Sequence, residues 1–143
     1  MGPYDLIVVG AGPAGMAAAV KAGACGLRVL ILDEQARPGG QIYRNVEILA
    51  CHLRQALGED YSRGEDATRA LRNSLVEYRP NATVLHLDQG RSIVWSQHDG
   101  LHRASAKRFI LATGAMERPF PIEGWTLPGV MTVGAAQIAL KSG

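Results

Sequence analysis

The sequence contains few of the residues that mark several common classes of protein. Its 143 residues include two cysteines, Cys25 and Cys51, which form no CxxC pair. Because no secretory leader precedes them, both thiols are expected to be reduced and structural. Aromatic residues make up 6% of the chain, and dispersed arginines leave a formal net charge of +2. No nucleic-acid-binding surface is therefore predicted.

Long hydrophobic runs and clusters of metal ligands are also missing. The apolar run at 6–9 is far too short to cross a bilayer, and no basic leader precedes it. No transmembrane segment is therefore predicted, and the cytoplasm is the expected location. Cys51 and His52 are adjacent, and on a helix such side chains point about 100° apart instead of converging on one ion. Since the four histidines are also scattered, the sequence predicts no metal site and assigns no catalytic residue.

Glycine, by contrast, is abundant, with 17 residues gathered in a few places. The first group follows the run Leu6–Val9, whose length and composition predict a buried parallel strand. The sequence GAGPAG at 10–15 then opens an alanine-rich segment that ends near Gly26 and is typical of a helix. A second apolar run at 29–32 predicts another strand. Together these segments predict a β-α-β unit with a right-handed crossover.

The GxGxxG pattern stands in the context that dinucleotide binding requires, directly after a strand and at the start of a helix. Gly10 allows a tight turn, Gly12 lets backbone approach a pyrophosphate, and Gly15 lets the helix pack closely on the strands. Pro13 and Ala14 lie in the first helical turn, where free N–H groups and the helix dipole favour a phosphate. The pattern therefore predicts a dinucleotide-binding turn.

Acidic residues end the second predicted strand and bear on which dinucleotide binds. Asp33 is expected to accept hydrogen bonds from a ribose diol, with Glu34 and Gln35 beside it. A carboxylate at this position repels a 2′-phosphate, which disfavours NADP. The next loop has a glycine pair ending at Gly40, followed by Gln41, where an NAD-binding domain normally enters another helix. Such a loop favours a flavin domain, and an ordinary surface turn is the alternative.

The remainder of the chain departs from a plain NAD-binding pattern. Periodic apolar residues predict helices over 46–57 and 67–78, separated by a polar loop at 58–64. Short β-rich runs follow at 83–87, 92–97, 101–106 and 109–111, with turn signals at Gln89-Gly90 and Asp99-Gly100. The last run leads into Thr113 and Gly114, another glycine turn after a strand. The predicted fold class is α/β, a Rossmann-like three-layer FAD-binding domain with a parallel sheet and a small β-meander.

Three segments carry a resemblance to a known family. They are VVGAGPAGMAAA and LDEQARPGGQIYR within 4–44, and ATGAMERPFPIEGWTLPGVMTVGAAQ within 108–139. The chain resembles the N-terminal FAD-binding region of flavoproteins with two dinucleotide-binding domains, the superfamily of pyridine nucleotide-disulfide oxidoreductases. The motifs are most similar to a branch that includes the alpha subunits of opine oxidases, hydrogen cyanide synthase and related amino-acid dehydrogenases.

This resemblance implies FAD as the cofactor. The residues that it implies near FAD are Gly10, Gly12, Gly15, Asp33, Gly40, Gln41, Thr113 and Gly114, with Glu34 and Gln35 beside them. The implied substrate is the C–N bond of an opine or amino acid. The implied partner is another subunit of a hetero-oligomeric dehydrogenase or oxidase, through which the protein would be able to associate with the inner face of a membrane.

Two departures from the family pattern limit these expectations. The loop at 41–44 contains no cysteine, and none follows before Cys51, which disfavours a disulfide reductase. The chain also ends before the second GxGxxG unit that related enzymes carry. We therefore expect a fragment or truncated subunit with an incomplete FAD site. Residues 1–116 would form the N-terminal portion of the FAD-binding domain. Residues 117–143, with a solvated hinge at Glu117-Arg118, would form a linker toward an absent domain for NAD(P).

Two classes of function follow from these observations. In the first, the chain is part of an oxidoreductase, inactive alone, in which FAD accepts two electrons and passes them to a partner subunit or carrier. The enzyme alternative is an NAD(P)H-dependent reductase of a ferredoxin-like acceptor. In the second class, the chain is a non-catalytic module for cofactor binding or assembly. Bleaching of a bound flavin by a substrate would distinguish the two classes.

Overall fold

The computed structural model describes residues 3–89 and 91–142 of the chain. The elements in chain order are β1 (Tyr4–Val9), α1 (Pro13–Ala24), β2 (Val29–Leu32), α2 (Cys51–Leu57), α3 (Glu59–Ser62), α4 (Gly64–Arg72), β3 (Glu77–Arg79), β4 (Thr83–Leu87), β5 (Ser92–Gln97), β6 (Gly100–Leu111) and α5 (Val133–Ser142). The described strands follow the order β3-β2-β1-β6-β5-β4. β1 pairs in parallel with β2 and β6, and β2 pairs in parallel with β3. β4 and β5 add antiparallel pairs that make a small meander with β6.

The predicted β-α-β unit is present at the start of the chain. All four residues of β2 are buried, as expected for a parallel strand that is covered on both faces. α1 begins with Pro13, whose missing N–H would be unpaired in the first turn in any case. The helix ends where Gly26 adopts a φ of +78°, which glycine reaches without the steric cost of a Cβ. The apolar runs and the glycine thus locate this unit correctly from sequence.

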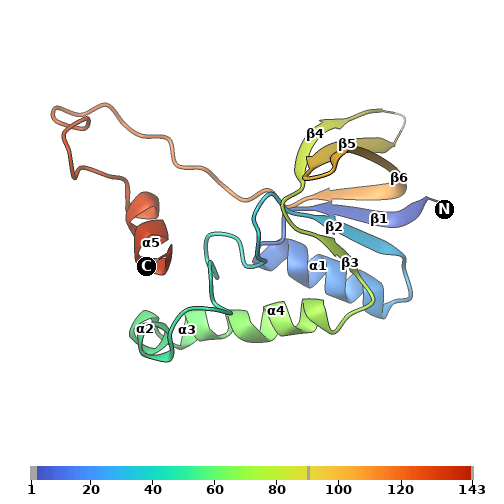
Figure 1. Ribbon diagram of the computed structural model, residues 1–143, viewed down its shortest axis with the longest axis horizontal. Helices are drawn as coiled ribbons and strands as arrows, with labels where there is room; N and C mark the ends of the chain where they lie inside the picture. Colours follow the sequence, from blue (N-terminus) through green and yellow to red (C-terminus); the bar gives the residue numbers. More distant parts are fainter. Residues whose placement is uncertain (1–2, 90, 143) are drawn as a thin grey trace.

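The molecule has three layers, as predicted. Successive residues of a strand point to opposite faces of the sheet, so Leu6 and Val8 face one side and Ile7 faces the other. Leu6 and Val8 pack with Met16 of α1 in a cluster that also includes a side chain of α4. Ile7 belongs to the opposite cluster, which contains Trp95 of the meander. Figure 1 shows the helices α1 and α4 on one side of the parallel strands and the meander on the other.

Strand β6 differs from the prediction, which divided it in two. Its first half pairs with β5 up to Ser105, and its second half continues beside β1 from Ala106 to Leu111. No turn-forming residue separates the halves, so the chain passes without interruption from the meander into the parallel sheet. The predicted Asp99-Gly100 hairpin joins β5 to β6, and Gly100 has a φ of +128°. Gly90, in the other predicted turn, lies outside the described residues.

The helical excursion was predicted less well. The predicted helix at 46–57 is an irregular turn followed by the short α2, and the predicted loop at 58–64 contains α3. The second predicted helix stops at Arg72, and Tyr78 lies instead in β3, opposite Ile31 of β2. Its spacing from Leu71 and Leu75 matched a helical face, yet Leu75 is 96% exposed. The open edge of β2 therefore decided the structure of this segment.

The C-terminal segment is different in character. After β6, residues 112–132 contain no regular helix or strand and lead to α5, which Figure 1 shows at a distance from the sheet. Large apolar side chains here are exposed, for example Met116 at 92% and Phe120 at 80%. The predicted division into 1–116 and 117–143 is not tested by this arrangement and stays a prediction. Among the described residues, no helix combines the length and apolar character that a membrane span requires.

Candidate functional site

A cleft of about 510 Å³ lies where the glycine turns meet. Its lining residues are Val9, Gly10, Gly12, Pro13, Ala14, Leu32, Asp33, Glu34, Gln35, Gly40, Gln41, Ile42, Arg44, Ala82, Thr83, Val84, Ala112, Thr113, Gly114 and Ala115. They come from the ends of β1, β2 and β6, from the loop that follows β2, and from the start of β4. Because β1, β2 and β6 are parallel, their carboxyl ends meet at one edge of the sheet, where ligands of such folds bind.

Gly10 and Gly15 are required by the fold itself. Gly10 has a φ of +100°, and its N–H donates to the carbonyl of Leu32 over 2.7 Å. A Cβ on Gly10 would collide with the carbonyl oxygen of Ala112, and a Cβ on Gly15 would collide with the carbonyl oxygen of Gly10. These two glycines therefore let the three strand ends and α1 pack backbone to backbone.

Gly12 differs from both of its neighbours in the motif. It has an ordinary φ of −71°, and the nearest atom to an added Cβ would be the Cα of Gly40, at 3.9 Å. The protein would therefore accommodate a side chain at this position, which opens into the cleft. Gly40 approaches from the other side, with a φ of +59°. The absence of a side chain at Gly12 is thus explained by a ligand that needs the space and not by the fold.

The N-terminus of α1 supplies hydrogen-bond donors to the same space. The helix begins at Pro13, directly after Gly12, which has no side chain to cap the first turn. The first N–H groups of a helix have no intrahelical partner and carry partial positive charge. Ala14 and Pro13 line the cleft. This end of the cleft therefore suits an anionic group such as a pyrophosphate.

Asp33 has a structural task that the sequence did not reveal. Its side chain is 6% exposed, and its two oxygens accept hydrogen bonds from the N–H of Ala11 and, over 2.7 Å, from the N–H of Gln35. Burial raises the pKa of Asp33 above its ordinary value, and the two backbone donors oppose that rise. The carboxylate thus ties the glycine turn to the end of β2. Glu34, beside it, is exposed and lines the cleft.

The structure brings together most of the residues singled out from sequence. The predicted residues that line the cleft are Gly10, Gly12, Pro13, Ala14, Asp33, Glu34, Gln35, Gly40, Gln41, Thr113 and Gly114. Gly15 is the exception, because it is buried beneath the turn. A shared cleft does not assign a role to each residue, so their contacts with a cofactor stay predictions.

Other lining residues were missed from sequence. Ala82, Thr83 and Val84 reach the cleft because Ala82 N–H donates to the carbonyl of Asp33 over 2.8 Å. No local motif signals this contact, which is made between segments far apart in the chain. Arg44 also lines the cleft, where its guanidinium donates to Gln35 Oε1 over 3.2 Å. As a cation that follows the glycine pair closely, Arg44 was visible in the sequence as a candidate partner for phosphate.

The cysteines take no part in this cleft. Cys25 follows α1 and Cys51 begins α2, and both are free and exposed. They are unpaired, as expected, but they are surface thiols rather than packed structural ones.

The chain matches the family described as "Pyridine nucleotide-disulphide oxidoreductase" over residues 4–140. The chain belongs to this family. The opine oxidase A-type subunit of Agrobacterium tumefaciens (strain Ach5) is 52% identical over 147 residues, which cover 97% of this chain and 29% of that protein. The HcnB subunit of hydrogen cyanide synthase from Pseudomonas aeruginosa is 38% identical, with 96% of this chain and 30% of that protein covered. The resemblance inferred from the three motifs is therefore confirmed.

Solved structures agree with the fold. L-proline dehydrogenase from P. horikoshii matches with a TM-score of 0.64 and 24% identity, covering 83% of this chain and 24% of that chain. Thioredoxin reductase from Streptococcus pyogenes matches with a TM-score of 0.58 and 29% identity, covering 83% of this chain and 38% of that one. The chain spans 28–31% of the length of the first curated relatives that it matches. Family and neighbours together support a flavin or dinucleotide cofactor.

Proposed function

We propose that this chain is the FAD-binding part of an oxidoreductase subunit. In the proposed reaction, FAD takes two electrons from the C–N bond of an opine or amino acid and passes them to a partner subunit or carrier. The substrate class is supported by relatives named as opine oxidase subunits. A partner is supported because the relatives are named as subunits. NAD(P) in a second domain and a cytoplasmic location remain expectations.

Gly12 is the observation that carries the proposal. Its backbone opens into the cleft, has an ordinary conformation and has room for a side chain, so its glycine is explained by a ligand. The position lies at the N-terminus of α1, where a pyrophosphate would find free N–H donors. Arg44 brings a positive charge to the same cleft. These features favour a dinucleotide, and the second glycine loop at 39–40 favours FAD over NAD.

The residues of the cleft divide into two ends in this proposal. Gly12, the first turn of α1 and Arg44 would hold the pyrophosphate, and the acids after β2 would hold the adenosine ribose. Gly40, Gln41 and the turn at 113–114 would lie along the flavin. When bound, FAD supplies the two-electron chemistry. The protein binds and orients it, and the turn held by Asp33 keeps the phosphate donors in position.

The Gly12→Asp variant tests cofactor binding. Aspartate is a favoured N-cap residue, so the fold and α1 should keep their stability. The same carboxylate stands where the pyrophosphate should bind, and like charges in contact cost several kcal/mol, which is about a 100-fold loss of affinity or more. Titration of apo-protein with FAD, followed by flavin fluorescence, measures this loss. Circular dichroism and urea denaturation confirm that the variant is folded.

Competition and reduction then test the choice of cofactor and reaction. NAD at the same concentration should not displace FAD from the wild-type chain. With the partner subunit supplied, an opine or amino acid should bleach the flavin absorption anaerobically. Bleaching by NADH alone would favour the ferredoxin-like reductase, and binding without bleaching by any donor would favour a non-catalytic module. Unchanged FAD binding by Gly12→Asp would overturn the proposal itself.

A further inference from the structure

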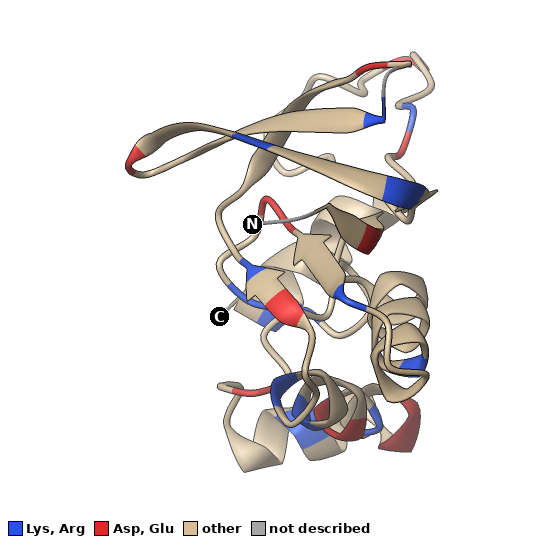
Figure 2. Ribbon diagram, turned by 90° about the vertical axis from the view of Figure 1, so that its right-hand side faces the viewer, with Lys and Arg blue, Asp and Glu red and all other residues tan. Residues whose placement is uncertain are grey.

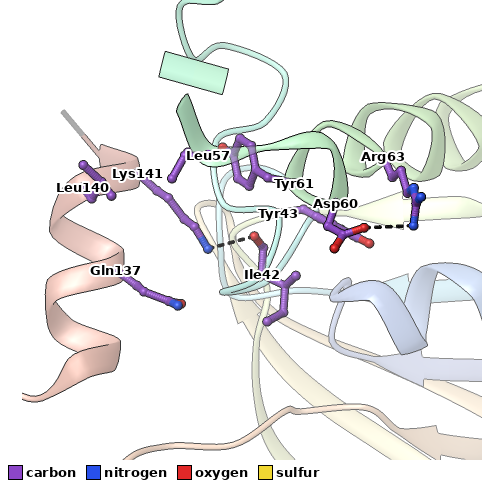
Figure 3. A pocket seen from close by; sticks show the side chains of 9 residues that line it. All are labelled: Ile42, Tyr43, Leu57, Asp60, Tyr61, Arg63, Gln137, Leu140 and Lys141. Carbon is purple, nitrogen blue, oxygen red and sulfur yellow. Dashed lines mark hydrogen bonds and ion pairs between the residues drawn. The ribbon is translucent and has the colours of Figure 1, made fainter. Parts of the chain in front are cut away.

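The C-terminal helix α5 returns to the glycine loop that forms one wall of the cleft. Lys141 is 7% exposed, and its Nζ donates to the carbonyl oxygens of Gln41 over 3.1 Å and of Ile42 over 3.0 Å. The ammonium also lies 5.4 Å from the centre of the Tyr61 ring. Figure 3 shows the side chain of Lys141 extending from α5 to the Ile42 carbonyl. A helix a hundred residues away in sequence thus holds the loop that follows β2.

Burying this lysine has an electrostatic cost. In residues 3–89 and 91–142, no carboxylate forms an ion pair with Lys141. Burial lowers the pKa of the Lys141 ammonium for this reason. The Asp60 carboxylate lines the cavity beside it but pairs with Arg63 at 2.9 Å. The two backbone carbonyls and the Tyr61 ring are therefore what stabilises the buried charge.

The two carbonyls matter because they set the direction of a peptide group. In a trans peptide the C=O and the following N–H point in opposite directions. With the Gln41 carbonyl turned to Lys141, the N–H of Ile42 points away from it. The N–H of Tyr43 is already used within the loop, donating to Gly39 over 3.0 Å. Gln41 and Ile42 both line the cleft, and Ile42 also lines the cavity of about 410 Å³ next to Lys141. The loop is thus a thin wall between the two spaces.

We propose that Lys141 is a positioning residue for the cleft. By holding the Gln41 and Ile42 carbonyls, it fixes the loop so that the Ile42 N–H is presented on the cleft side. The effect on a bound flavin rests on the proposed function, whereas the ordering of the loop does not. Since a ligand that needs the ordered loop must also favour the docked helix, cofactor binding and α5 docking are linked.

Four variants of the 143-residue chain test this proposal. Lys141→Met keeps the length of the side chain and removes the donors. Lys141→Arg keeps the charge and the donors, and the adjoining cavity gives the guanidinium room. Lys21→Met makes the same change at an exposed lysine of α1 and is the matched control. Asn45→Gly removes a second anchor of α5, the bond from Asn45 Nδ2 to the Lys141 carbonyl over 3.0 Å, and tolerates the φ of +59°.

Amide hydrogen exchange in the apo-protein is the first measurement. Lys141→Met should speed exchange at Ile42 and Tyr43 by about ten-fold or more, because it removes hydrogen bonds to a charged group. Lys141→Arg should restore most of the protection, and Lys21→Met should leave it unchanged. Exchange at 41–43 that is the same in Lys141→Met and wild type would overturn the proposal. This result does not depend on whether FAD binds.

The spectrum of bound FAD is the second measurement and separates positioning from simple anchoring. Lys141→Met should shift the visible flavin bands and weaken FAD by about ten-fold, the effect of one lost bond to a charged group. Asn45→Gly should loosen α5 and leave the bands in place, because the Lys141 ammonium still holds both carbonyls. Equal spectra for Lys141→Met and wild type, with FAD bound, would overturn the positioning role. If wild type binds no FAD, the proposed function fails, and exchange at 41–43 alone decides for or against Lys141.

Discussion

The β-α-β unit at the start of the chain and the segment 112–142 at its end line the same cleft but are held in different ways. In the first, Ile7, Val8 and Ile31 are completely buried, and the strands pair along their whole length. In the second, Phe120 is 80% and Val133 75% exposed. The first region is fixed by hydrophobic packing and the second by a few polar contacts. The comparison predicts that mutations in the two regions will differ in kind as well as in size.

The same type of contact shows this difference most directly. Asp33 and Glu117 each accept backbone N–H groups, Asp33 from Ala11 and Gln35, Glu117 from Gly134 over 2.9 Å. Asp33 is buried, whereas Glu117 is exposed to solvent. A buried donor that loses its acceptor remains unsatisfied, but an exposed one turns to water. Glu117 is therefore more than the solvated hinge expected from sequence, but its contact with α5 is replaceable.

The charges of the molecule do not separate the two regions. Figure 2 shows Lys and Arg interspersed with Asp and Glu over the helices and the edges of the strands. Several of these form exposed pairs, such as Arg72 with Glu47 and Lys107 with Asp5. Because such pairs contribute little in water, the contrast between the two regions rests on burial and not on charge.

The largest effect is expected in the buried strands. Ile31→Ala should lower the free energy of unfolding by about 2–5 kcal/mol, because it leaves a cavity between β2 and the helices. Phe120→Ala should change it by less than about 0.5 kcal/mol, because that ring is largely in solvent. Urea denaturation followed by circular dichroism measures both. Similar losses in the two variants would show that the C-terminal segment packs more tightly than its exposure indicates.

The next effect concerns Asp33. Asp33→Ala leaves the N–H groups of Ala11 and Gln35 without their acceptor, which should lower stability by about 1–3 kcal/mol. The variant should also weaken FAD, since the glycine turn loses its tie to β2. Glu34→Ala is the matched control and should leave stability unchanged, because its side chain is exposed. Urea denaturation and FAD titration of both variants check this. A stable Asp33→Ala protein with full FAD affinity would contradict the role of Asp33.

A smaller, pH-dependent effect is expected at Glu117. Hydrogen bonds from the Thr132 hydroxyl and then from the N–H groups of Gly134 and Ala135 lower the pKa of Glu117 below its ordinary 4.5. The ionised carboxylate therefore stabilises the start of α5 above pH 4.5, and this contribution is lost as pH falls through the lowered pKa. The Gly134 amide resonance should follow this titration by NMR. In Glu117→Gln the transition should disappear. A midpoint above 4.5 in wild type would reverse the sign of the interaction.

The smallest effect is expected at the surface thiols. Cys25→Ser and Cys51→Ser remove groups that are exposed and unpaired, so stability and FAD content should both stay close to wild type. Absorption spectra of the purified variants measure the bound flavin. Loss of electron transfer in either variant, with folding and flavin intact, would instead point to a redox cysteine of the kind that disulfide reductases use.

The amino-acid sequence by itself determined the β-α-β unit, the meander and the family. A parallel strand buried on both faces is continuously apolar, and a turn that packs against backbone needs glycine, so both leave local signals at 6–15 and 29–33. The turn at 113–114 was visible for the same reason. Such features are encoded by residues that lie next to one another in the chain.

Tertiary structure decided the features that depend on distant partners. Tyr78 joined β3 because β2 offered an open edge, although its spacing matched a helix. Val84 reached the cleft through the pairing of Ala82 with Asp33, and Asp33 became a brace as well as a ribose candidate because the glycine turn folds over it. Lys141 met the loop at 41–42 only when α5 docked. Each of these contacts joins residues far apart in sequence, and backbone carbonyls and N–H groups, which every residue has, carry no sequence signal.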